Sequence, residues 1–90
     1  MKPVRFTKHA IQRMKERGAR KEDVMEAIRT GRREPAERGL FFYRLNLEFG
    51  REWDGRRYAV QQVSPVVDEE DDCFVVVTVY TFYYQEEGRQ

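Results

Sequence analysis

Apolar positions in the first third of the chain repeat with a helical period. A first helix is expected over residues 8–17, with Thr7 as its N-cap and Gly18 where helices commonly end in a left-handed residue. A second helix is expected over residues 21–30, ending at Gly31. In each helix the apolar side chains share one face, which predicts burial on one side: Ala10, Ile11 and Met14 in the first, Val24, Ala27 and Ile28 in the second.

The second half of the chain follows the period of two that is typical of strands. From Leu40 onward, apolar side chains fall on one face and polar side chains on the other. Asp54-Gly55 is a strong tight-turn dipeptide, so a return strand over residues 56–63 would complete a hairpin. Residues 74–82 are nearly continuous in β-branched and aromatic side chains, which predicts a strand covered on both faces or lying in the sheet centre.

The remaining segments show no clear period. Residues 2–6 could form a short edge strand, and residues 32–39 are interpreted as a connector. Ser64-Pro65 and the acidic run at 68–72 are interpreted as the loop before the last strand.

The elements together predict one α+β domain over residues 1–90. Their order is (β)ααβββ, with two N-terminal helices packed on a three- to four-stranded antiparallel sheet. Gly50, inside the first long strand, is a candidate bulge.

Composition narrows the chemistry that this domain can carry. Apolar residues make up 40% of the chain, too many for a disordered segment, and no apolar run approaches the roughly 20 residues of a membrane helix. We therefore expect a cytoplasmic protein with no membrane partner. A single cysteine, Cys73, cannot form an intramolecular disulfide, and with one histidine it cannot form an ordinary structural zinc site. The acidic run at 68–72 lacks the spacing of a calcium loop, so neither a metal nor a cofactor is expected.

Charge is divided unevenly along the chain, although the net charge is only +1. Residues 1–38 hold 12 Lys and Arg against 6 Asp and Glu, whereas residues 39–90 hold 5 against 10, giving +6 and −5. The basic half could attract an anionic partner, or the two halves could simply attract each other.

One candidate site lies on the first helix. His9, Arg13 and Arg17 are spaced i, i+4 and i+8, so they form one stripe beside the apolar face. An imidazole that moves a proton, next to two guanidiniums that stabilise charge on phosphorus, suits a phosphodiester. An ordinary solvated helix face would carry the same pattern.

A second group of candidates is aromatic and basic. Aromatic side chains on the strands could stack unpaired bases, with Tyr80 and Tyr83 the strongest candidates. Arg44, Arg56 and Arg57 lie on the predicted hairpin and would contact RNA beside them. Most of the aromatic residues would equally serve as core.

The same residues carry a resemblance to a known family. Residues 6–18, with the sequence FTKHAIQRMKERG, and the following Glu22-Asp23-Val24 resemble the opening signature of the domain-of-unknown-function family 4258. The final stretch 76–80, VVTVY, is similar to its closing strand. That family is similar in element order to the RelE/ParE/BrnT group of small toxins, many of them ribonucleases neutralised by a partner antitoxin.

The resemblance implies a site and two classes of function. His9, Arg13 and Arg17 would be the family's helix-borne polar residues, and Thr78 and Tyr80 would match the end of its last strand. The leading interpretation is a toxin-like, metal-independent endoribonuclease acting on RNA or on ribosome-bound RNA, or a degenerate relative of one. The alternative is a non-catalytic module that binds RNA or a protein such as an antitoxin.

Overall fold

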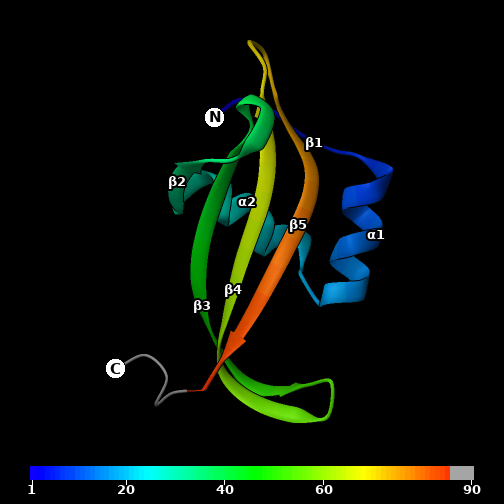
Figure 1. Ribbon diagram of the computed structural model, residues 1–90, viewed down its shortest axis with the longest axis vertical. Helices are drawn as coiled ribbons and strands as arrows, with labels where there is room; N and C mark the ends of the chain where they lie inside the picture. The colour runs from blue at the N-terminus through cyan, green and yellow to red at the C-terminus, as the bar shows by residue number, and fades with distance from the viewer. Residues whose placement is uncertain (86–90) are drawn as a thin grey trace.

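The protein is an α+β domain in which two helices pack on a five-stranded mixed sheet (Figure 1). The computed structural model describes residues 1–85. Along the chain the elements are β1 (Val4–Phe6), α1 (Lys8–Arg17), α2 (Lys21–Thr30), β2 (Arg32–Pro35), the 3-10 turn η1 (Glu37–Gly39), β3 (Phe41–Trp53), β4 (Arg56–Glu69) and β5 (Phe74–Tyr84). The strand order is β1-β5-β4-β3-β2; β1 is parallel to β5, and every other pair is antiparallel.

Both helices have the bounds predicted from the sequence, and the caps explain those of α1. The Thr7 hydroxyl accepts a hydrogen bond from the Ala10 amide at 3.0 Å, which satisfies a donor at the open end of the helix. Gly18 adopts φ 73° and its N–H donates to the Met14 carbonyl, as a left-handed C-cap does. A Cβ at Gly18 would stand 2.6 Å from the Trp53 ring, so this position has room only for glycine.

The helices cover one face of the sheet and leave the other open. In Figure 1, α2 crosses behind the strands and α1 runs beside β5. The core lies between the helices and the inward faces of β3, β4 and β5; its buried members are Ala10, Met14, Val24, Ile28, Tyr43, Val63, Val67, Val76 and Val79. Alternation along the strands sends the neighbouring residues to the open face, where Tyr80, Phe82 and Tyr84 are each about 40% exposed.

Three sequence-based expectations about the strands are wrong. The sheet has five strands and is not wholly antiparallel, because β1 forms and pairs in parallel with β5. Residues 32–35 are not part of a connector but form β2, which pairs with Phe41–Arg44 and has Pro35 at its end, where a missing N–H is tolerated. The third error concerns β5, which is neither central nor covered on both faces: it is second in the strand order, β1 pairs only with Phe74–Val76, and Tyr80, Phe82 and Tyr84 are exposed on one face.

The loop expected at Ser64-Pro65 is also wrong, because β4 continues to Glu69. Ser64 and Pro65 are fully buried in the central strand. Pro65 pairs in register with Val79 of β5, and the register shifts one residue farther on, between Val66 and Val67, where Val77 of β5 is the extra residue. The bulge expected at Gly50 is confirmed, since the β3–β4 register shifts between Glu48 and Arg51 and Gly50 has φ 59°.

Candidate functional site

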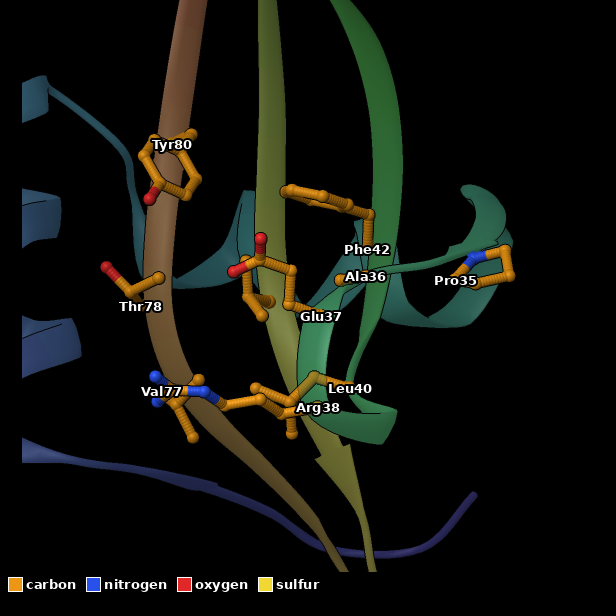
Figure 2. Close-up of a pocket in the computed structure, with 10 residues that line it drawn as sticks. Pro35, Ala36, Glu37, Arg38, Leu40, Phe42, Val77, Thr78 and Tyr80 are labelled. Atoms are coloured by element: carbon orange, nitrogen blue, oxygen red, sulfur yellow. The ribbon is translucent and has the colours of Figure 1, made fainter.

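A hollow of about 670 Å³ lies on the open face of the sheet, between β5 and the η1 turn (Figure 2). Its floor and one wall come from β3, β4 and β5, and the other wall comes from the segment that joins β2 to β3. The lining residues are Pro35, Ala36, Glu37, Arg38, Leu40, Phe42, Val66, Val77, Thr78 and Tyr80. Phe42, Val66 and Thr78 stand in one row across the three strands, because they are direct partners in the sheet register.

The η1 turn holds two charged side chains over this hollow. It is closed by hydrogen bonds from the Ala36 amide to the Leu40 carbonyl at 2.8 Å and from the Leu40 amide to the Glu37 carbonyl at 3.1 Å. Arg38 has φ 60°, a left-handed conformation that is uncommon outside glycine. Figure 2 shows the Arg38 side chain extending toward Val77 and the Glu37 carboxylate pointing into the space between β5 and Phe42.

Two aromatic rings at one end of the hollow carry guanidiniums. The centroids of Phe42 and Tyr80 are 6.2 Å apart and their planes are inclined at 51°. The Arg44 guanidinium lies 4.1 Å from the Phe42 centroid and the Arg17 guanidinium 4.8 Å from the Tyr80 centroid. A row of arginine, two aromatic rings and arginine therefore crosses the open face, with attraction between each cation and its ring.

Arg17 reaches this row because the end of α1 is fixed to β5. Its guanidinium donates to the Val79 carbonyl at 2.8 Å. Its own carbonyl accepts hydrogen bonds from the Thr81 hydroxyl at 2.9 Å and the Tyr83 hydroxyl at 2.6 Å. Gln61, buried in β4, donates to the next carbonyl, that of Gly18. These side chains satisfy carbonyls that a helix end leaves without partners, and so hold Arg17 at the strand edge.

His9 and Arg13 do not line the hollow. Arg13 donates to Glu16 on its own helix at 2.6 Å, and hydrogen bonds from Gln12 and then from Arg13 lower the pKa of Glu16. The His9 side chain is exposed, and no hydrogen bond joins it to another residue within 1–85. Of the five predicted catalytic residues, the structure brings Arg17, Thr78 and Tyr80 together and leaves His9 and Arg13 farther along α1.

The other predicted RNA contacts are dispersed. Arg44 lies on the open face, where it donates to Glu34 at 2.7 Å and to Ser64 at 3.2 Å. Arg56 and Arg57 are exposed at the start of β4 and do not line the hollow. Tyr83 belongs to an aromatic cluster on the covered side of the sheet, stacked on Trp53 with centroids 5.3 Å apart.

The sequence-based search missed Glu37 and Arg38, the two charged residues in the wall of the hollow. Residues 32–39 were interpreted as a connector, so no position in the fold was predicted for their side chains. Pro35 and Gly39 bracket a short charged segment, which is the composition of a turn, and a hairpin between β2 and β3 could have been predicted from it.

One group in the described part of the chain has side chains of metal-binding type. Ligand atoms of Glu70, Asp72 and Cys73 lie within 4.8 Å of one another at the tip of the β4–β5 hairpin. Burial, followed by the charge of Asp72, raises the pKa of the Cys73 thiol. Because metals bind the thiolate, this cysteine is a poor ligand.

Comparison with protein families identifies the domain. The sequence pattern of the family described as Domain of unknown function (DUF4258) matches residues 6–81. The chain belongs to this family. The match confirms the resemblance to family 4258 that the sequence predicts, and it includes α1, the η1 turn and all of the hollow.

No curated protein and no solved structure matches the chain significantly. Within residues 1–85, neither helix has the length and the apolar character that crossing a membrane requires.

Proposed function

We propose that this member of the DUF4258 family is a metal-independent endoribonuclease related to the RelE/ParE/BrnT toxins. Single-stranded RNA would place one nucleotide in the hollow and run past the Arg17–Tyr80 pair along α1. His9 would take the proton of a ribose 2′-hydroxyl, whose oxygen attacks the adjacent phosphorus. The bond to the 5′-oxygen breaks, a 2′,3′-cyclic phosphate forms, and His9 returns the proton to the leaving oxygen.

The observation that carries this proposal is the Arg17 guanidinium 4.8 Å from the Tyr80 ring at the rim of the hollow. A cation beside an aromatic ring offers a phosphate contact next to a stacking platform for a base. Helical geometry supports Arg13 as a group that stabilises charge on the phosphate and His9 as the group that moves the proton. Both follow Arg17 on the same side of α1, with His9 roughly 12 Å from Arg17 along the axis.

Cleavage assays test the proposal directly. Purified protein is incubated with labelled single-stranded RNA, with and without ribosomes, and the products are examined for 2′,3′-cyclic phosphate ends. His9→Ala and Arg13→Ala should each lower the rate by at least about 100-fold, the usual scale of a lost acid-base or charge-stabilising group. Cleavage that is absent in both assays, or that persists unchanged in both variants, would show the proposal to be wrong.

A second function, RNA binding without cleavage, is favoured by the positions of His9 and Arg13. The hollow and the aromatic row could hold RNA without either residue, and Arg13 is already paired with Glu16. Salt-dependent binding of single-stranded RNA with no products after long incubation would support this function. An antitoxin-like protein covering the open face is a third outcome, which growth arrest on expression, relieved by a co-expressed partner, would reveal.

A further inference from the structure

We propose that the hollow selects guanine, with Glu37 reading the base and Arg38 holding its phosphate. The inference rests on the proposed function and names the nucleotide that the same site prefers.

The carboxylate of Glu37 is in an unusual place for an exposed acidic side chain. It points into the hollow over β4, between the strand of Thr78 and Tyr80 and the ring of Phe42 (Figure 2). No ion pair or hydrogen bond ties it to another residue in the described chain, so both of its oxygens are available as acceptors.

Base chemistry decides which ring suits this carboxylate. Guanine is the only one of the four RNA bases that presents two adjacent donors, N1–H and the 2-amino group, on its Watson–Crick edge. Adenine and cytosine offer one amino group beside an acceptor nitrogen, and uracil offers one N–H between two carbonyls. Each of those edges would place an acceptor against a carboxylate oxygen, whereas guanine would form two charge-assisted hydrogen bonds.

The remainder of the hollow fits a nucleotide that is stacked and held by its edge. Val66 and Val77 provide an apolar floor, Leu40 adds apolar surface to the wall, and Tyr80 and Phe42 provide rings for stacking. The volume of about 670 Å³ is within the usual range for small-ligand sites. Arg38 is the only arginine among the lining residues, and its side chain crosses the hollow from the η1 turn toward β5.

The η1 turn fixes the positions of Glu37 and Arg38, so they differ from charged side chains that are free on a surface. Two hydrogen bonds close the turn, and Arg38 and Gly39 have φ 60° and 74° in succession. This left-handed pair places the two charged side chains on the side of the hollow, and a non-glycine residue in this conformation is commonest where surrounding structure or function holds it.

Fluorescence anisotropy with labelled pentanucleotides UUNUU, where N is G, inosine, A, C or U, tests the proposal. The wild type should bind the G oligonucleotide about 10- to 100-fold more tightly than the A, C and U forms. Inosine, which keeps N1–H but lacks the 2-amino group, should fall between them. Glu37→Gln should remove most of this preference, while Arg38→Gln should weaken all five oligonucleotides by a similar factor.

Arg29→Gln is the matched control, because it removes an arginine from α2 on the covered side of the sheet and should change neither affinity nor preference. Equal binding of all five oligonucleotides, or a preference for guanine that survives Glu37→Gln, would overturn the assignment while leaving an RNA-binding function intact. Failure to bind any of them would overturn both. Thermal unfolding of each variant shows that a lost preference does not arise from misfolding.

Discussion

Both the backbone conformation and the packing around Gly18 require a glycine at this position. Its φ of 73° is strained for any side chain, and a Cβ would meet Trp53. We expect Gly18→Ala to lower the free energy of unfolding by roughly 2–4 kcal/mol, the cost of a left-handed non-glycine residue plus a clash with an aromatic ring. Urea denaturation measures it. Gly39→Ala is the matched control, because Gly39 has φ 74° and open space around it, and should lose only about 1 kcal/mol.

Arg38 should lower the stability of the fold while contributing to RNA binding. Replacing it with glycine removes a strained side chain, so Arg38→Gly should raise the free energy of unfolding by up to about 1 kcal/mol while weakening RNA binding. Asp54→Gly is the control, since Asp54 has φ 55° and lies outside the hollow, and it should raise stability without weakening binding. If Arg38→Gly bound RNA as well as the wild type, Arg38 would have no part in binding.

At the scale of elements, β2, β3 and β4 are joined on the covered side of the sheet by one carboxylate. Arg33 from β2 donates twice to Glu69 at 2.8 Å, and the Tyr43 hydroxyl from β3 also donates to it. The bonds from Arg33 are the largest cause that lowers the pKa of Glu69 from 4.5 to about 2. The carboxylate is therefore more easily kept charged in the folded chain than in the unfolded chain.

Because the folded chain lowers the pKa of Glu69, the folded protein should lose stability as the pH falls. The stability that Glu69 contributes is complete above pH 4.5 and is lost as the pH falls toward 2. We expect the free energy of unfolding of the wild type to decline across this window, and Glu69→Gln to decline less steeply. Urea denaturation at several pH values measures both curves. Parallel curves would mean that this carboxylate does not stabilise the fold.

The elements also show why part of the fold could be predicted from the sequence. Each helix carries its own apolar face, and α1 also carries its own caps, so local signals place α1 and α2 correctly. The strands β1 and β2 are short, and β2 takes its strand conformation by pairing with β3, so the turn residues Pro35 and Gly39 are the local signal for this hairpin. Pro65 lies inside β4, paired with Val79 of β5, although proline is uncommon in an interior strand, so the local sequence signal favoured a loop there.

The candidate site was predictable to the same extent. Tyr80 and Arg17 stand in recognisable elements, and helical and strand spacing put them on the correct surfaces. Glu37 and Arg38 could not be assigned, because their positions depend on how η1 folds back over the sheet. Spacing alone also could not show that Arg13 pairs with Glu16.

For the whole molecule, the near-zero net charge means that RNA affinity should come from a few local contacts. If Arg17 and Arg38 each neutralise one phosphate, the logarithm of the association constant should fall with the logarithm of salt concentration with a slope of about −1.4. Arg38→Gln should reduce the slope by about 0.7, and Arg29→Gln should leave it unchanged. A slope several times steeper would indicate a broad basic surface that the acidic strands do not offer.

The edge of β5 that β1 leaves unpaired affects whether the protein associates with copies of itself. Beyond β1, the carbonyls of Val77 and Val79 accept hydrogen bonds from Thr7 and Arg17, so a neighbouring chain finds these acceptors already occupied. An open strand edge is where folded proteins add strands to one another and aggregate. Arg17 therefore also opposes self-association, because it occupies the Val79 carbonyl. The Arg17→Ala variant should be less soluble than the wild type and should bind RNA more weakly.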